Sequence, residues 1–257
     1  MSFLICLKSE YLKNKRTFSF WLVLFGGLLV PVILFFIQLN RSEFFMKRAT
    51  DPWNPLVFDA IRSAMPLLFP LFLILIIALN FNLEHKENTW KKLHVIPHKR
   101  DSIYFAKLVF IIIQVVLSLL VFSFSLFLFG LLLGIIHPEL NFLNTSLDWT
   151  TLFKSLAKVF IAYLALIGFQ FVLSFYFKNF IVPVAVGLFG LIFGIMLSNW
   201  EYSAYNFWSN NFNVIEHLLK KVVGDYTLGI PTYLIFSGMY FLIFIVIGRF
   251  LFNRRAL

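Results

Sequence analysis

The sequence predicts an all-α membrane protein that forms a single transmembrane domain over residues 1–257, and three observations support this prediction. First, 60% of the 257 residues are hydrophobic and only 13% are charged, whereas about a quarter of the residues in soluble domains are charged. Second, the mean hydropathy is +0.87, and apolar residues gather in six runs close to the roughly 20 residues that a membrane-crossing helix needs. Third, these runs do not alternate with polar residues, which excludes the strands of an outer-membrane barrel.

The positions of Lys and Arg predict how the six spans are oriented. The predicted spans are Phe18–Leu39, Pro66–Leu83, Leu108–Leu133, Val159–Tyr176, Ile181–Leu197 and Tyr233–Phe250. Six spans put both termini on one side, which then holds fourteen of the 22 Lys and Arg residues. Because basic residues favour the cytoplasmic side, we expect both termini to be cytoplasmic in a multi-pass protein of the inner (plasma) membrane. The net charge of +10 therefore indicates contact with the lipid bilayer, and no nucleic-acid partner is expected.

The first residues, 1–17, predict a helix that lies in the cytoplasmic membrane interface. Apolar residues recur at three- and four-residue spacing, and charged residues fill the other positions. The apolar set is Phe3, Leu4, Leu7 and Tyr11, and the charged set is Lys8, Glu10, Lys13, Lys15 and Arg16. We expect the apolar side in lipid and the charged side near the headgroups. The alternative is an ordinary charged flank of the first span.

Four later features refine the layout. Pro66 is expected in the first turn of the second span, where a missing backbone donor is tolerated. Ile103–Ile136 would be about 50 Å long as one helix, so it either projects from the membrane into the cytoplasm or bends near Gly130 and Gly134, and we favour projection. The outer segment 198–231 is rich in aromatic residues, which predicts one or two short helices that dip into the outer leaflet. Gly190 and Gly194 allow close helix packing in the fifth span.

The predicted spans contain no residues typical of chemistry inside a membrane. No Asp, Glu, Lys or Arg lies at mid-span, where ion-coupled carriers and pumps usually have them. Gln114 and Gln170 are the conspicuous deep polar residues, and each can either bond a neighbouring helix or contact a substrate in a transport pathway. We expect no catalytic residue, no metal site and no cofactor bound by this chain.

The absence of two kinds of motif from the sequence supports that expectation. The spacing of Glu84, His85, Glu87, His94 and His98 matches neither a His-Glu-x-x-His zinc helix nor a cysteine-histidine zinc site. The sequence also has no phosphate-cradling loop in which Gly precedes Lys and Ser or Thr. ATP, if it is used, must therefore be bound by another subunit.

The charged segment 84–107, between the second and third spans, predicts a short helix that docks on a partner. Asn88 or Thr89 can cap it, Trp90, Leu93 and Ile96 form an apolar ridge, and Pro97 ends it. A two-turn helix is too short to be stable alone. It therefore needs either a groove on a cytoplasmic protein or the membrane surface.

This segment resembles the corresponding part of ABC-2-type transporter permeases. In chain order, the family pattern consists of the short motifs Glu-x-Gly-Thr, Leu-Leu and Pro-x-x-Arg, then a single Ile, and finally Gly-Lys. The matching residues here are Glu87, Thr89, Pro97, Arg100, Ile103 and Lys107. Asn88 and Ala106 replace the two glycines of that pattern. The opening Leu7–Arg16, with Trp21 and Pro31, is most similar to the branch of lantibiotic-immunity and bacitracin-resistance permeases.

The resemblance implies a fold, partners and a role. It implies an N-terminal elbow helix, a cytoplasmic coupling helix between spans two and three, and short outer helices between spans five and six. It also implies that a separate ABC ATPase binds ATP, and that a second permease copy or a paralogue completes the pathway. By the resemblance, the residues that couple ATP hydrolysis to motion are Glu87, Thr89, Trp90, Leu93 and Pro97.

The substrate class and the alternatives complete the prediction. An aromatic, uncharged pathway suits export of an amphipathic substrate, such as a peptide antibiotic or a lipid-like molecule. Two alternative hypotheses for the function are a gradient-driven carrier or channel, and a non-transporting assembly factor or anchor. An intramembrane enzyme ranks last, because the sequence offers neither a nucleophile motif nor a metal cluster.

Overall fold

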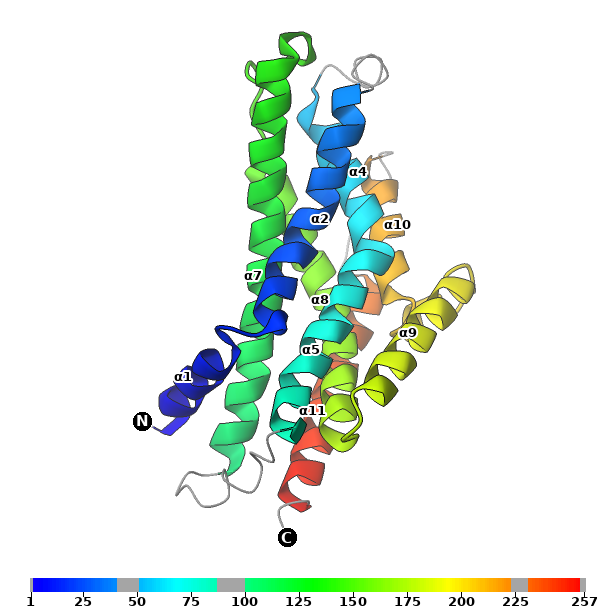
Figure 1. Cartoon of the computed structure of the whole chain (residues 1–257). Helices are drawn as coiled ribbons and strands as arrows, with labels where there is room; N and C mark the ends of the chain where they lie inside the picture. Colours follow the sequence, from blue (N-terminus) through cyan, green and yellow to red (C-terminus); the bar gives the residue numbers. More distant parts are fainter. Residues whose placement is uncertain (1, 41–50, 87–99, 223–230, 255–257) are drawn as a thin grey trace.

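The computed structural model describes residues 2–40, 51–86, 100–222 and 231–254, and every regular element in these ranges is a helix. The long helices pack side by side into an elongated bundle (Figure 1). In chain order the elements are α1 (Ser2–Asn14), α2 (Phe18–Asn40), α4 (Trp53–Ser63), η1 (Ala64–Leu68), α5 (Phe69–Lys86), α7 (Arg100–Ile136), η2 (Pro138–Leu140), α8 (Trp149–Tyr176), α9 (Ile181–Met196), η3 (Ser203–Tyr205), α10 (Asn210–Val222) and α11 (Thr232–Arg254).

Within the described residues, five helical stretches are long and apolar enough to cross a membrane, so this is a multi-pass membrane protein. They are Phe18–Asn40, Trp53–His85, Arg100–Ile136, Trp149–Tyr176 and Thr232–Arg254. The sixth predicted span corresponds to α9, which has 16 apolar residues. At about 1.5 Å per residue, α9 is roughly 24 Å long, which is shorter than a bilayer core of about 30 Å. The all-helical fold class is confirmed, and the six-span layout stays a prediction.

The second span begins earlier than the sequence predicts. Helix α4 starts at Trp53 and runs through the π-helical turn η1 into α5, so Pro66 lies inside the helix and not in its first turn. A π turn pairs each carbonyl with a donor five residues on, and this wider turn leaves room for the proline ring, which in an α-helix clashes with the carbonyl of the preceding turn. The hydroxyl of Tyr163 in α8 donates to the carbonyl of Met65 in this turn. The prediction failed because it treated the proline as a helix start.

Helix α7 confirms the predicted length of the third helix, since it is continuous for 37 residues. In the upper part of α7, the indole ring of Trp53 from α4 packs against Gly130. A side chain at this position would overlap the ring, because an added Cβ atom has no room there. The indole Nε1 of Trp53 donates to the carbonyls of Phe142 (3.2 Å) and Thr145 (3.1 Å). These contacts fix α4 to the upper end of α7 and to the loop that follows it.

Residues 198–222, the described part of the predicted outer segment, fold back onto the bundle. The ring of Trp208 occupies the space over Gly190, and its backbone lies against Gly194. The two glycines of α9 therefore accommodate this segment rather than another long helix. Helix α10 buries Val214 and Ile215, and it packs against α8.

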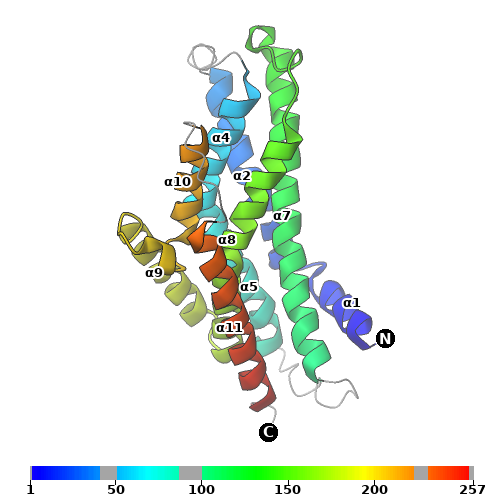
Figure 2. The same ribbon diagram turned by 180° about the vertical axis from the view of Figure 1, so that it is seen from behind.

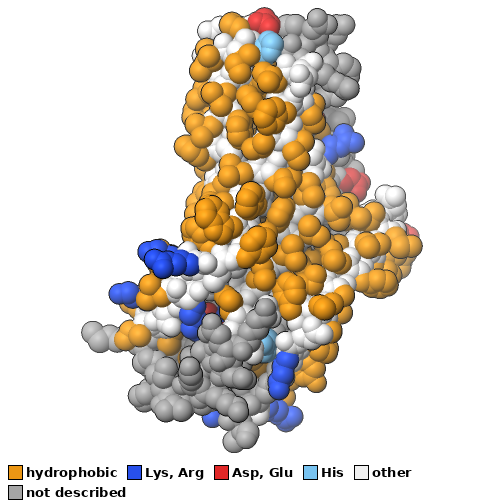
Figure 3. All heavy atoms as spheres, in the orientation of Figure 1, with side chains coloured by type: hydrophobic (Ala, Val, Ile, Leu, Met, Phe, Trp, Pro, Cys, Tyr) orange, Lys and Arg blue, Asp and Glu red, His pale blue; other side chains and the backbone are white. Residues whose placement is uncertain are grey.

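Both ends of the described chain lie at the same pole of the bundle, which is the lower pole in Figures 1 and 2. The last turn of α5 and the first turn of α7 lie there too, so the lower pole gathers α1, the ends of α5 and α7, and the end of α11. On the face drawn in Figure 3, hydrophobic side chains cover the middle of the molecule, and most Lys and Arg side chains lie near the lower pole. This distribution fits a membrane-embedded bundle whose lower pole is basic.

Candidate functional site

At the lower pole, four charged side chains from three helices meet in what we call the ionic cluster: Glu10 and Lys13 of α1, Glu84 of α5 and Lys107 of α7. Lys107 Nζ donates to Glu10 Oε2 at 2.8 Å and lies 2.9 Å from Glu84 Oε1. Lys13 Nζ donates to the other Glu10 oxygen at 2.6 Å and to Glu84 Oε1 at 3.2 Å. Two carboxylates and two ammonium groups therefore balance in charge.

The centre of the cluster is shielded from solvent. Glu10, Glu84 and Lys107 are each at most 3% exposed, and the Lys107 ammonium lies 5.0 Å from the centre of the Phe81 ring. Charges are rarely buried unless they are paired. Removing one partner of a buried pair typically costs about 3–5 kcal/mol, because an uncompensated charge remains.

The electrostatic environment of Glu10 follows from these neighbours. Burial alone would raise the pKa of Glu10, but the ammonium groups of Lys107 and Lys13 outweigh it and hold the pKa below its usual value. Glu10 is therefore ionised at neutral pH.

Glu10 contradicts part of the sequence prediction for the first helix. The sequence placed it with the headgroup-facing charges, whereas the structure turns it into the protein toward α7. Leu4 and Tyr11, by contrast, are exposed as predicted, at 69% and 48%. The positions of Lys107 and Glu84 in the sequence were the signal that could have indicated a buried partner for Glu10. Each borders an apolar run, where a charge needs a partner, yet the sequence cannot show which helix supplies it.

One helical turn above the cluster, amide side chains continue the polar contact between helices. Asn80 Nδ2 of α5 donates to Gln114 Oε1 of α7 at 2.8 Å and to Ser19 Oγ of α2 at 3.0 Å. Asn80 precedes Glu84 by one turn of α5. Gln114, which the sequence singled out for a pathway, thus accepts a hydrogen bond from Asn80 of α5 inside the bundle. Its role in a transport pathway stays a prediction.

Gln170, the second predicted pathway residue, joins two other helices. It is completely buried in α8, and its Nε2 donates to the carbonyl of Pro183 in α9 at 3.0 Å. Gly187 of α9 leaves room for its side-chain oxygen. This contact supports the short α9 against α8, and the structure does not bring Gln170 together with Gln114.

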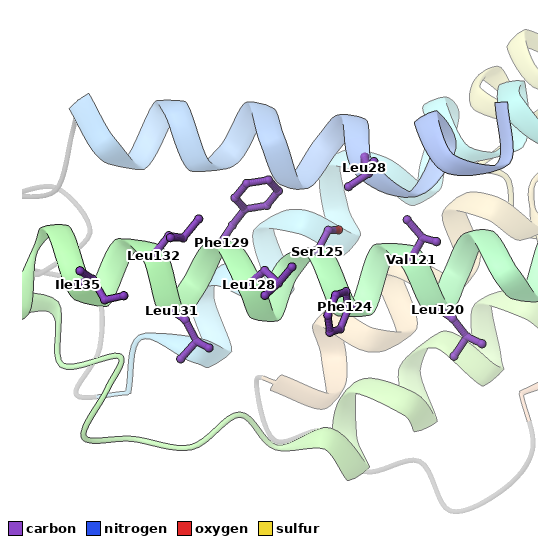
Figure 4. Close-up of a pocket in the computed structure, with 10 residues that line it drawn as sticks. All are labelled: Leu28, Leu120, Val121, Phe124, Ser125, Leu128, Phe129, Leu131, Leu132 and Ile135. Atoms are coloured by element: carbon purple, nitrogen blue, oxygen red, sulfur yellow. The ribbon is translucent and has the colours of Figure 1, made fainter. Parts of the chain in front are cut away.

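A groove of about 700 Å³ runs along the upper half of α7 beside α2 (Figure 4). Its lining is Leu28, Leu120, Val121, Phe124, Ser125, Leu128, Phe129, Leu131, Leu132 and Ile135. Ser125 is the single polar side chain, and its hydroxyl already bonds the carbonyl of Phe122 at 2.9 Å. The groove can therefore take a hydrocarbon chain but offers little to a charged group.

The predicted coupling residues Glu87, Thr89, Trp90, Leu93 and Pro97 lie outside the described residues. Of the segment 84–107, the structure describes only the two ends. Both ends carry a residue of the ionic cluster, Glu84 on one side and Lys107 on the other.

Comparison with known proteins gives one match. A family model described as an ABC-2 family transporter protein matches residues 6–194, which include most of α1, the ionic cluster and the whole segment 84–107. No curated protein and no solved structure matches the chain.

Proposed function

This chain belongs to the ABC-2 transporter family, and on that premise we propose that it is the membrane permease subunit of an ABC exporter. In this proposal a separate ABC ATPase binds beneath residues 84–107, and a second permease copy or a paralogue completes the pathway. Members of the family are membrane transport components, not ATPases, and usually work as dimers with an ABC ATPase. The observation that carries the proposal is the family match over residues 6–194.

The arrangement at the lower pole supports the proposed mode of coupling. The ends of α5 and α7 lie at the same pole as both termini (Figure 1), so a push on the segment between them reaches two membrane helices directly. By the family resemblance, Glu87, Thr89, Trp90, Leu93 and Pro97 receive that push, with Trp90 and Leu93 seated in the ATPase. Binding and hydrolysis of ATP in the partner would then rock α5 and α7.

The proposed substrate is an amphipathic molecule, such as a peptide antibiotic or a lipid-like compound, moved out of the cytoplasm or the inner leaflet. Two observations support this class. No charged residue lies at mid-span, and the groove beside α7 accepts only apolar groups. The similarity of Leu7–Arg16 to antibiotic-resistance permeases favours a peptide antibiotic.

Co-expression with an ABC ATPase encoded beside this chain tests the proposal. We expect the ATPase to co-purify at a one-to-one ratio with the permease, and Trp90→Ala and Leu93→Asp to remove it or uncouple transport while membrane insertion stays normal. The matched control is Trp200→Ala, because Trp200 is exposed and lies on the predicted outer side. Normal ATPase binding and transport in both Trp90 and Leu93 variants would overturn the assignment. Retention of transport without any ATPase would favour a gradient-driven carrier.

A further inference from the structure

We propose that the ionic cluster is a latch that fastens α1 to both helices flanking residues 87–99, so that these three helix ends move as one body. The motion itself rests on the proposed function, whereas the latch can be tested without any partner. Lys107, Glu10 and Glu84 act in it as positioning residues.

The first argument is connectivity. Lys107 contacts Glu10 and Glu84 at the same time, so one ammonium group joins α1, α5 and α7. Lys13 repeats the bridge between Glu10 and Glu84 from α1. Neither end of the segment can be displaced from α1 without separating charges that have little access to water.

The second argument is a comparison with another ion pair of the same pole. Arg249 of α11 and Asp101 of α7 form a two-point contact at 2.7 and 2.9 Å, but both side chains are about half exposed. Water can replace such a contact at little cost. It cannot easily replace those of Lys107, which is 3% exposed. The cluster is therefore the rigid joint at this pole, and the Asp101 pair is not.

The third argument is that the latch continues into the first span. Asn80, one turn above Glu84, bonds Ser19 of α2 and Gln114 of α7. A displacement of the latched helix ends would thus also be transmitted to α2. Helix α1 then moves together with the latched ends of α5 and α7, rather than independently of them in the membrane interface.

The single cysteine of the chain provides a direct probe of the latch. Cys6 lies on α1 one turn before Glu10, and 8% of it is exposed. In native membranes, N-ethylmaleimide should therefore label it slowly in the wild-type protein. We expect Lys107→Met to raise the labelling rate at least about tenfold, because an uncompensated buried charge favours release of α1. The Cys6→Ser variant has no thiol, so it measures the background labelling.

Two variants control for effects unrelated to the latch. Lys107→Arg keeps the charge and should label within about twofold of the wild type, since Arg pairs well with carboxylates. Arg249→Met removes a charge of the same pole from an exposed pair and should also stay within about twofold.

If Lys107→Met does not accumulate, Glu10→Gln gives the same test with a rise of about threefold, since Lys107 retains Glu84. Labelling of both cluster variants as slow as in the wild type would overturn the latch.

A second measurement separates the latch from the proposed function. In the complex with the ABC ATPase, Lys107→Met should leave co-purification intact and lower ATP turnover, while Arg249→Met should leave turnover unchanged. Failure of the wild-type chain to bind any ATPase would contradict the proposed function alone, and the Cys6 labelling rates would still decide the latch. Unchanged turnover in Lys107→Met would show that the three helix ends need not move as one body.

Discussion

The two poles of the bundle are held together by different forces. At the lower pole, four charged side chains from α1, α5 and α7 pair with one another, and three of them, Glu10, Glu84 and Lys107, are buried. At the upper pole, Trp53 inserts between α7 and the loop after it, against the bare backbone of Gly130. One joint depends on charge balance and the other on shape.

This difference matters for a protein that transmits force. An ionic joint tolerates small changes of side-chain geometry as long as the charges stay paired, whereas an aromatic ring against a glycine tolerates almost no added volume. We therefore expect the lower pole to respond to charge and pH, and the upper pole to respond to side-chain size. The following predictions test that contrast, from the largest effect to the smallest.

Lys107→Met should be the most damaging change at the lower pole. It leaves Glu10 and Glu84 with Lys13 alone, which should lower the free energy of unfolding by about 3–5 kcal/mol. Thermal unfolding in detergent micelles measures this loss. Lys107→Arg should restore most of it, and a similar loss in both variants would show that shape, not charge, governs this pole.

Acid should weaken the lower pole selectively through Glu10. Its pKa is lowered in the folded protein, so its contribution is complete above the usual value of about 4.5 and is lost as the pH falls below it. The groups facing it are Lys107 of α7, Glu84 of α5, and Lys13 and Cys6 of α1. The melting temperature should fall more steeply with acid in the wild type than in Glu10→Gln. Parallel curves would contradict the prediction.

Gly130→Ala should disturb the upper pole by size alone. The added methyl group overlaps the Trp53 ring, and overpacking of this kind costs about 1–3 kcal/mol. Trp53→Phe in the same chain frees space, so the double variant should lose less stability than the sum of the single ones. Strict additivity in this cycle, measured by thermal unfolding, would show that the two residues do not press on each other.

Trp53→Phe alone should have a smaller effect. It keeps an aromatic ring but removes the Nε1 donor to the carbonyls of Phe142 and Thr145, which should cost about 1–2 kcal/mol. The loss should not depend on pH, unlike that at the ionic cluster. A pH-dependent loss would break the contrast between the two poles.

Arg249→Met should have the smallest effect on stability. Its partner Asp101 is exposed, and exposed pairs contribute about 1 kcal/mol or less. Thermal unfolding at low and high salt should show little difference from the wild type. A loss comparable to that of Lys107→Met would mean that burial does not distinguish the two ion pairs.

Composition and run length predicted most of the fold, because a bilayer imposes long apolar helices whatever their partners. The length of α7 and the turn between α8 and α9 followed from the sequence in this way. The start of the second span at Trp53 did not, because Pro66 indicates the first turn of a helix unless a π turn accommodates it. The prediction that α9 forms a span rests on its 16 residues, which are all apolar or glycine, and it stays a prediction.

The candidate site was less accessible to sequence reasoning. The sequence places Glu10, Glu84 and Lys107 near the ends of apolar segments, but it cannot show that they point at one another from three helices. The amide contacts of Asn80 are equally hidden, because Gln114 was found by its depth and Ser19 gave no signal. Similarly, Gly190 and Gly194 predicted a close approach but not that Trp208 makes it. Pairings between distant residues depend on the packing, which the local pattern does not encode.

The central claim, that an ABC ATPase drives this permease through residues 87–99, is tested most directly by a photo-crosslinking side chain placed at Trp90. In native membranes containing the co-expressed ATPase, we predict an adduct between position 90 and that ATPase, and none from position 200. An adduct with lipid alone, or labelling of position 90 by a reagent confined to the outside of the cell, would contradict the claim.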